Sequence, residues 1–373
     1  MIRRRATRIK LIRSANCFTL TLWLLIIGFI AIGSIGGCNN DDRGSSGWIS
    51  GNAVNDSGES GDGSYGTILH TSDGGKTWVR QGSEDTLPDS AVSSIVALDA
   101  NRVWAVAAHA VLSTSDGQNW RQHSVPTTAE LVTIYPLSNE ILWVVGYEGT
   151  VLRSTDGAAS WEVSQVPVQD VQLQGVYSVD GQTAWVGGGM ITDTETTGII
   201  WKTDDGGKSW TEQYRGGPKP FETIRGVDGE TLWAGAGANR IIGTTDGGKT
   251  WQLQTEPTTQ FADVNGLSVV DRNTVFGAWD FGMYLTTDGK TWTHKEPSPF
   301  ATFYLGVDAI DDQEVWLVGP IQSGPDLSGL VAHTLDAGQN LGRSSGAACK
   351  SRVPLGVVRE VEVVQQRLVC GMY

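Results

Sequence analysis

One eight-residue pattern recurs along this chain and constrains its fold more than any other feature. It reads TSDGGKTW at residues 71–78 and TTDGGKTW at residues 244–251. Weaker copies align on the same aspartate, and the full series is Asp73, Asp116, Asp156, Asp205, Asp246, Asp288 and Asp336. Successive aspartates are 43, 40, 49, 41, 42 and 48 residues apart. A near-constant period of this length is typical of a repeat architecture.

Each unit follows one template of strands and turns. Residues 141–161 show it most clearly as ILWVVGYEGTVLRSTDGAASW: an apolar strand, a glycine turn, an alternating strand, the aspartate turn and a tryptophan. Beyond the N-terminus, no long stretch has the apolar spacing of 3.6 residues that marks a helix. The chain is therefore predicted to be all-β.

The tryptophans fall into two sets with fixed positions in the template. Six close the aspartate turns, namely Trp78, Trp120, Trp161, Trp210, Trp251 and Trp292, and six open the middle strand of a unit, namely Trp48, Trp104, Trp143, Trp185, Trp233 and Trp316. Only Trp23, Trp201 and Trp279 of the 15 tryptophans lie outside both sets. Large rings at one recurring position are what stacked sheets bury, so these twelve are predicted to be core.

The repeated aspartates are predicted to be structural. In such a turn the carboxylate accepts hydrogen bonds from backbone N–H groups that follow it, while glycine supplies a positive φ. Seven copies at nearly equal spacing cannot share one active site. We therefore interpret the series as a fold signal rather than as a set of catalytic acids.

These turns carry a family resemblance. The pattern S/T-x-D-x-G-x-T/S-W resembles the Asp-box, or BNR repeat, of sialidases, sortilin-type receptors, xyloglucanases and photosystem II assembly and stability factors. The resemblance covers residues 48 to about 341, although Ala158 replaces a glycine in the third copy and Leu341 replaces the tryptophan in the last. It implies a seven-bladed β-propeller of four-stranded antiparallel blades over residues 48–373.

The two chain ends are expected to close the ring. The first unit lacks an innermost strand before Trp48, and VVREVEVVQQRLVCGMY at the C-terminus matches the start of a unit. Pairing of this segment with the first unit would remove the exposed edges of an open array. An incomplete eighth blade is the alternative, and residues 342–353 fit only a loop.

The N-terminus predicts export and lipidation. Six basic residues precede the apolar run FTLTLWLLIIGFIAIG, which is the layout of a signal peptide. The following Ile35, Gly36, Gly37 and Cys38 resemble the lipobox of bacterial lipoproteins. We expect residues 1–37 to be the signal peptide, Cys38 to carry the lipid, and residues 38–47 to be a polar tether at the inner or outer membrane. The alternative is an uncleaved membrane anchor.

The remaining cysteines and charges fit an exported domain. Cys349 and Cys370 are a candidate disulfide pair, with two free thiols as the alternative. Removal of residues 1–37, which contain six basic and no acidic residues, changes the net charge from −14 to about −20. Such a surface repels nucleic acid, so we expect no nucleic-acid partner.

Catalysis finds little support in the residue pattern. The arginine-bearing entry motif of sialidases is absent, and arginines are scattered. A carboxylate pair of the xyloglucanase kind can always be chosen from 41 acidic residues, so a glycosidase stays an alternative. The five histidines show no metal-ligand spacing, and we expect neither a metal nor a cofactor.

A partner is expected on the face opposite the aspartate turns. The longest insertions, 52–65, 187–198 and 319–329, are predicted there as loops. Exposed candidates on this face are Tyr147, Glu148, Tyr214, Arg215, Lys219, Phe221, Arg240, Trp279, Asp280 and Phe281. Trp279 has a second interpretation, as the replacement of the strand-two tryptophan, whose place Phe276 takes.

Two classes of function follow. The first is a non-enzymatic, membrane-anchored platform or assembly factor for an envelope or membrane complex, as the resemblance to the photosystem factor implies. The second is a surface protein that binds or cleaves a glycan. Converging carboxylates with raised pKa values at the channel mouth would favour the enzyme, and an aromatic rim without them would favour the platform.

Overall fold

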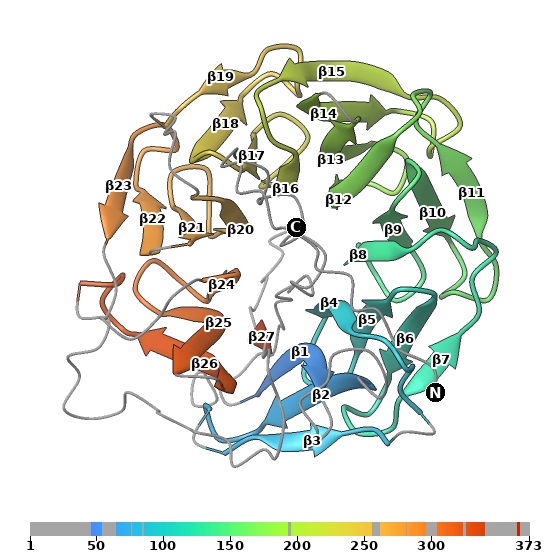
Figure 1. Ribbon diagram of the computed structural model, residues 1–373, viewed down its shortest axis with the longest axis vertical. Coiled ribbons are helices and arrows are strands. Elements are labelled where there is room, and N and C mark those ends of the chain that lie inside the picture. Colours follow the sequence, from blue (N-terminus) through green and yellow to red (C-terminus); the bar gives the residue numbers. More distant parts are fainter. Residues whose placement is uncertain are drawn as a thin grey trace, which may run out of the picture.

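The computed structural model describes the repeat region and one short segment near the C-terminus. The described residues are 46–53, 65–75, 77–83, 86–192, 195–255, 262–280, 282–295, 304–323, 326–339 and 364–365. Within these ranges the chain forms 27 β-strands and no α-helix. The strands make seven small antiparallel sheets arranged in a ring (Figure 1). The prediction of a seven-bladed β-propeller is confirmed.

Each sheet is one blade, and its strands follow one another outward from the centre. Blade one contains β27 (Val364–Gln365), β1 (Gly47–Ala53), β2 (Tyr65–Thr71) and β3 (Val79–Gln81). Blade two contains β4 (Val92–Ala97), β5 (Val103–Ala107), β6 (Ala110–Thr114) and β7 (Arg121–His123). Blade three contains β8 (Leu131–Pro136), β9 (Leu142–Gly146), β10 (Thr150–Ser154) and β11 (Glu162–Gln165).

The remaining blades repeat this order. Blade four contains β12 (Val171–Ser178), β13 (Ala184–Ile191), β14 (Thr196–Thr203) and β15 (Thr211–Gly216). Blade five contains β16 (Phe221–Gly226), β17 (Leu232–Ala236), β18 (Arg240–Thr244) and β19 (Gln252–Leu253). Blade six contains β20 (Val264–Val269), β21 (Val275–Trp279), β22 (Gly282–Thr286) and β23 (Trp292–Lys295). Blade seven contains β24 (Gly306–Ala309), β25 (Val315–Ser323) and β26 (Asp326–Thr334), three strands within the described part of the chain.

The ring closes in the way that the sequence predicts. β27 takes the innermost position of blade one and pairs antiparallel with β1, with Trp48 opposite Val364. A second contact joins blades one and seven, because Gly75 lies directly against the ring of Trp316. Strand pairing and side-chain packing therefore both connect the first and last blades.

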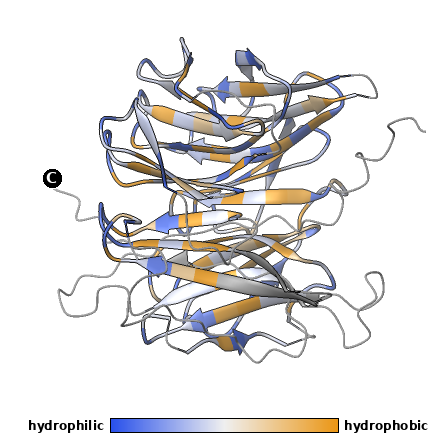
Figure 2. Cartoon of the chain, turned by 60° about the vertical axis from the view of Figure 1, so that its left-hand side comes forward, coloured by the Kyte–Doolittle hydropathy of each residue, from blue (hydrophilic) through white to orange (hydrophobic). Residues whose placement is uncertain are grey.

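The core lies between neighbouring blades. The second and third strands of blades two to six consist almost entirely of buried residues, whereas the outermost strands are largely exposed. Accordingly, the apolar residues gather in the middle of the strands (Figure 2). The six tryptophans that open a second strand are at most 5% exposed, and Phe276 takes this position in blade six at 0% exposed. Burial of such rings supplies much of the favourable free energy of folding.

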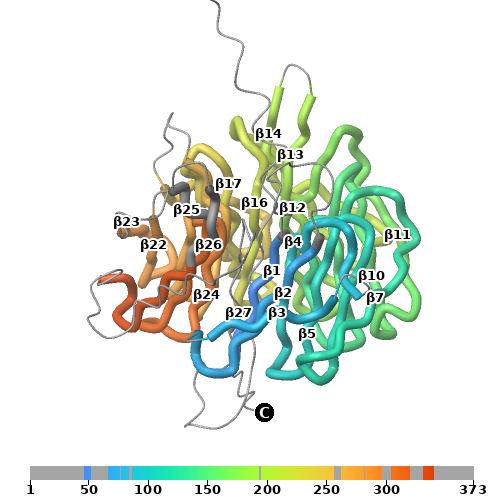
Figure 3. Tube along the Cα trace, turned by 60° about the horizontal axis from the view of Figure 1, so that its bottom comes forward, coloured from blue at the N-terminus to red at the C-terminus, as the bar shows by residue number. Residues whose placement is uncertain are grey.

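Two of the predicted loop insertions are strands. β13 and β14 pair continuously as far as Ile191 and Thr196, and β25 and β26 pair as far as Ser323 and Asp326. Figure 3 shows the hairpin of β13 and β14 extending beyond its neighbours. The expectation of loops at 187–198 and 319–329 is wrong, because antiparallel pairing continues through both segments to a tight turn. In the first insertion the ladder reaches Ala53 and Tyr65.

Several predictions fall outside the described residues. The signal peptide, Cys38 and most of the tether lie in residues 1–45, and Cys349, Cys370 and Phe281 are also outside the described ranges. In the part of the chain that is described, no helix is long and apolar enough to span a membrane.

Candidate functional site

The repeated aspartates each organise a turn on one rim of the ring. The Thr244 hydroxyl donates to Asp246 Oδ1 at 2.8 Å, and Asp246 accepts from Thr250 N at 2.9 Å and from the Thr250 hydroxyl at 2.7 Å. The same set of hydrogen bonds surrounds Asp73, Asp156 and Asp205. The shorter turns at Asp116 and Asp288 use two successive backbone N–H groups instead, and Asp336 accepts from the Thr334 hydroxyl.

These hydrogen bonds stabilise the charged form of the carboxylates. Donation from the side chain and backbone of Ser160, Ser209 and Thr250 lowers the pKa of Asp156, Asp205 and Asp246 to about 2. A carboxylate that is already saturated with donors is a poor proton acceptor in catalysis. The seven aspartates also lie on seven different blades, so the fold does not bring them into one site.

The turns also lock each blade to its neighbour. The indole N–H of Trp185 in blade four donates to Gly247 O in the turn of blade five at 3.3 Å, and that of Trp233 in blade five donates to Gly289 O in blade six at 3.0 Å. The aspartate turns and the strand-two tryptophans thus form one connection between blades.

The opposite face carries the turns between second and third strands, where the partner residues are predicted. Tyr147 lies in such a turn in blade three and is partly buried. Burial, together with the charges of Glu130 and Glu222, raises its pKa to about 12. Trp279 is also partly buried, and it packs against Tyr284 and His294 of its own blade at ring distances of 5.4 and 4.5 Å. Its packing supports the structural interpretation of Trp279.

Other predicted partner residues are not available at this face. Arg240 is only 7% exposed, and it donates to Gly216 O at 3.1 Å and to the Tyr214 hydroxyl at 2.6 Å. Tyr214 in turn packs edge-on against Phe221, which is 0% exposed. The expectation that Arg240 and Phe221 are exposed is wrong, because Gly216 and Gly217 cover Arg240, and the glycines of β13 and β14 lie against Phe221. Arg215 is exposed but is held by an ion pair with Glu212 at 2.6 Å.

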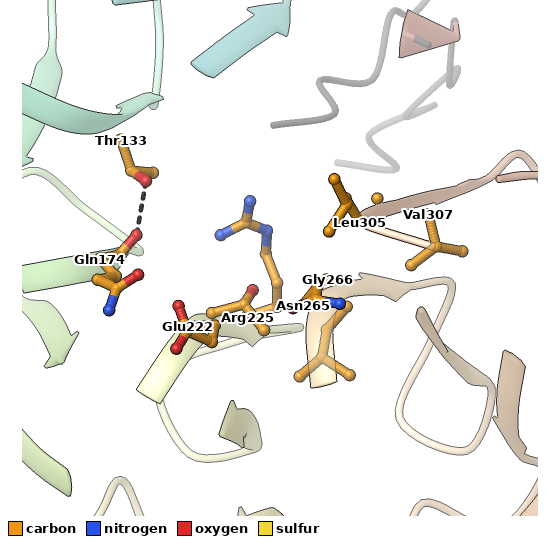
Figure 4. A pocket seen from close by; sticks show the side chains of 11 residues that line it. Thr133, Gln174, Glu222, Arg225, Asn265, Gly266, Leu305 and Val307 are labelled. Carbon is orange, nitrogen blue, oxygen red and sulfur yellow. Dashed lines mark hydrogen bonds between the residues drawn. The ribbon is translucent and has the colours of Figure 1, made fainter. Parts of the chain in front are cut away.

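The innermost strands enclose a small cavity in the channel (Figure 4). It measures ≈ 40 Å³, and its polar lining residues are Thr133 of β8, Gln174 of β12, Glu222, Thr223 and Arg225 of β16, and Asn265 of β20. Thr133 donates to the backbone oxygen of Gln174 at 2.5 Å. The side-chain oxygen of Gln174 is buried and has no hydrogen-bond partner within the described residues.

Carboxyl groups converge at the mouth of this cavity. Burial and the charges of Asp263 and Asp280 raise the pKa of Glu222 to about 8, against an opposing effect of Lys219. Burial raises the pKa of Asp280 to about 6, although its carboxylate accepts from Asp263 N and from Asn265 Nδ2, both at 2.9 Å. Converging carboxyl groups with raised pKa values are typical of enzyme active sites, so they count in favour of an enzyme.

A different electrostatic environment surrounds Arg225. Its Nη1 donates to Ile224 O at 2.9 Å. Burial lowers its pKa, while Tyr135 and Asp308 raise it. Within the described residues, no cluster of three or more His, Cys, Asp or Glu side chains is arranged to hold a metal ion.

A larger hollow of ≈ 460 Å³ lies between the outer strands of blades five and six, beside Tyr284 and Trp292. Its polar groups bond to one another: the Tyr284 hydroxyl donates to Asn239 Oδ1 at 2.5 Å, and Trp292 Nε1 donates to Gln254 Oε1 at 2.8 Å. These groups are engaged within the protein rather than directed toward a ligand.

Gln174, Glu222, Arg225 and Asp263 were not among the site residues predicted from the sequence. Gln174 lies within the innermost strand β12, and Glu222 and Arg225 lie within β16, where other polar residues also occur, so the pattern gave no clear signal for them. Asp263 precedes β20 and carried no signal either, since its place at the mouth depends on how the blade begins.

Comparisons with known proteins support the fold. Residues 57–227 match the family model described as the DUF6242 beta propeller domain. A comparison with curated protein sequences found no match.

Several solved structures are similar to this chain. YCF48 from Cyanidioschyzon merolae has a TM-score of 0.56 at 14% identity, with 83% of this chain and 96% of that chain covered. YCF48 bound to a D1 peptide has a TM-score of 0.52 at 16% identity, with 68% of this chain and 84% of that chain covered. The GH74 xyloglucanase from Xanthomonas campestris has a TM-score of 0.54 at 13% identity, with 86% of this chain but only 55% of the enzyme covered. At these identities the likeness shows the fold: the chain is a β-propeller that resembles YCF48.

Proposed function

We propose that this protein is an exported bacterial lipoprotein whose propeller is a binding platform for a segment of a membrane or envelope protein. In this proposal Cys38 carries the lipid, residues 38–47 are the tether, and the channel mouth faces the partner. The chain acts by holding its partner and performs no chemistry on it.

The size of the cavity behind the converging carboxyl groups carries this proposal. At ≈ 40 Å³ it has room for only a few water-sized groups, since about 10 to 15 Å³ of such space holds one water molecule. A sugar ring is several times larger. A protein segment that lies across the mouth needs to insert only the tip of one side chain, which this space accepts.

The mouth also offers what a protein partner needs around that point. Tyr147 presents an aromatic ring that is partly buried before any partner binds, and aromatic side chains are frequent anchors of interfaces. YCF48, whose fold this chain shares, has been solved with a D1 peptide. That structure is a precedent for peptide binding by a propeller of this kind.

Affinity capture from intact cells tests the proposal. Cells are crosslinked, membranes are extracted in mild detergent, and proteins recovered with the full-length chain are identified by mass spectrometry. We expect one membrane or envelope protein to be recovered repeatedly, and to be lost with Tyr147→Ala. The matched control is Asp204→Ala, an exposed position on the aspartate rim, which should leave recovery unchanged. If the partner is lost with Asp204→Ala but not with Tyr147→Ala, the interface lies on the aspartate rim, and the proposed docking face is wrong.

Glycoside cleavage is the second candidate, and one observation favours it. The raised pKa values of Glu222, about 8, and Asp280, about 6, would keep a carboxylic acid protonated near neutral pH, as a general acid requires. Release of reducing sugar from xyloglucan or of sialic acid from sialosides, abolished by Glu222→Gln, would support it. Absence of any such release at pH 5 to 8 would leave the platform as the better account.

A further inference from the structure

The cavity in the channel contains hydrogen-bond acceptors that the protein does not use. Gln174 is 5% exposed, and its side-chain oxygen has no partner among the described residues. Glu222 lines the same cavity, and within the described part of the chain its carboxyl group forms neither a hydrogen bond nor an ion pair. Figure 4 shows both side chains on the same side of the cavity. A buried acceptor without a donor is costly, so the Gln174 oxygen points to a donor that arrives from outside, and Glu222, which is only partly buried, is open to the same donor.

The charge around these acceptors calls for a cation. Three carboxyl groups, Glu222, Asp263 and Asp280, act on one another at the mouth, and Lys219 is the cation that offsets them. Arg225 lines the same cavity; its Nη1 donates to Ile224 O, and Tyr135 and Asp308 offset only part of the effect of burial, which lowers its pKa.

Burial first, and after it the charges of Asp263 and Asp280, raises the pKa of Glu222 to about 8. At neutral pH its carboxyl group is therefore mostly protonated in the free protein.

We propose that the channel mouth is a socket for a single primary ammonium group of the protein partner, with Glu222 and Gln174 as the acceptors that bind it. This inference rests on the proposed platform function and names the chemistry that the platform recognises. An ammonium group has three donors and no acceptor, and it is a compact point charge. It therefore matches both the pair of acceptors and the ≈ 40 Å³ of space.

Binding has a defined proton balance. As the ammonium group enters, the Glu222 carboxyl releases its proton to solvent, and the resulting carboxylate pairs with the ammonium. The groups whose charges act on Glu222 are Asp263, Asp280 and Lys219, with Tyr147 beside it and Arg225 lining the same cavity. Formation of one ion pair thus releases up to one proton per ligand bound.

Titration calorimetry of the full-length chain in detergent at pH 7 tests the socket. The probe is N-acetyl-lysine N-methylamide, its control is the norleucine analogue, and alanyl-alaninamide presents an α-ammonium instead. Each titration is run in two buffers of different ionisation enthalpy. We expect N-acetyl-lysine N-methylamide to bind the wild-type protein with release of a proton. Its affinity should be at least ten times lower for Glu222→Gln and for Gln174→Met, and should be unchanged for Glu212→Gln. Binding of the α-ammonium probe alone would also support the socket and would identify a chain terminus as its source.

Equal binding of the norleucine control, no binding of either ammonium probe, or unchanged affinity and proton release in Glu222→Gln would overturn the socket. Circular dichroism of each variant verifies that it is folded. The two proposals fail separately: a partner captured from cells but no probe binding rejects only the socket, whereas an empty capture with the wild-type chain rejects the platform itself.

Discussion

At the residue scale, the same carboxylic side chain serves opposite purposes on the two faces of the ring. On one rim, Asp246 is surrounded by donors of its own turn, and these lower its pKa. At the channel mouth, Glu222 accepts no hydrogen bond from the described residues, and burial raises its pKa. The environment of each acidic side chain, rather than its residue type, decides whether it stabilises a turn or belongs to the candidate site.

Substitution of Asp246 tests the structural role of the repeated aspartates. We expect Asp246→Ala to lower the melting temperature, because the backbone N–H and hydroxyl of Thr250 lose their acceptor. Binding of a partner should not change. Differential scanning calorimetry gives the comparison, with Asp204→Ala in the neighbouring turn as control. A fully stable Asp246→Ala protein that has lost its partner would contradict the structural role.

Acid conditions provide a second test of these turns. The folded-state pKa values of Asp156, Asp205 and Asp246 are about 2, below the ordinary value of 3.8. Their contribution to stability is therefore complete above pH 3.8 and is lost as the pH falls toward 2. The melting temperature of the wild-type protein should fall over this interval, and the melting temperature of Asp246→Ala should fall by less. Parallel pH profiles of the two proteins would rule out this source of stability.

Glu222 should make the stability of the folded protein depend on pH in the opposite direction. Its pKa is raised from 4.5 to about 8, so the unfolded chain ionises before the folded one and stability is lost as the pH rises through this range. Glu222→Gln lacks this ionisation. We expect the melting temperature of the variant, relative to wild type, to increase between pH 5 and pH 8. A difference that stays constant over the range would show that Glu222 is not held neutral in the folded chain.

Residues were predictable from the sequence where the template repeats and unpredictable where it does not. The aspartate and tryptophan positions recur several times, so each copy supports the others. Arg240 occurs once, and only the path of the loop before β16 shows that it is covered. Glu222 and Gln174 required knowledge of which strands meet at the channel.

At the scale of elements, the connection between blades depends on a tryptophan of one blade and a turn of the next. Gly75 combines two requirements of this contact: its φ is +79°, and an added Cβ would lie 2.6 Å from the Trp316 ring. This contact joins the last blade to the first. Glycine is needed here both for its backbone conformation and for space.

Gly75→Ala tests the contribution of this contact to closure. Positive φ alone costs an alanine about 1 to 2 kcal/mol, and displacement of the indole should add about 1 to 3 kcal/mol. The control is Gly157→Ala in blade three, where φ is +69° but the nearest atom is a backbone oxygen 3.0 Å away. Chemical denaturation should show the larger loss for Gly75→Ala. Equal losses would mean that the tryptophan contact adds nothing to closure.

Strand boundaries were the least predictable elements. The template locates each second and third strand, because a tryptophan and a glycine turn flank them. It does not show how far β13 and β14 or β25 and β26 continue, since both hairpins extend past the repeat. The length of a ladder is set by pairing across the hairpin, which a single strand's sequence does not reveal.

At the scale of the whole molecule, the protein is a closed ring of blades. The seven blades and their closure by β27 follow from the repeat and the matching chain ends, and both were predictable. Lipid attachment at Cys38 remains a prediction from the N-terminal sequence. Several acyl chains on one cysteine would hold the propeller at a membrane surface.

Cys38→Ala tests this attachment. We expect the wild-type protein to sediment with membranes and the variant to lose that association, because the modified cysteine is absent. Fractionation followed by mass measurement of the purified N-terminus detects both the location and the lipid. A Cys38→Ala protein that still partitions with membranes and retains residues 1–37 would indicate an uncleaved anchor instead.

The central claim is that the face bearing the channel mouth binds a protein partner. Site-specific photocrosslinking in living cells tests it most directly, with a photoreactive amino acid placed at Tyr147 on this face and, in a separate strain, at the exposed Lys208 on the aspartate rim. The account predicts one dominant crosslinked membrane or envelope protein from position 147 and none from position 208. The same partner from both positions, or crosslinks from position 208 alone, would contradict it.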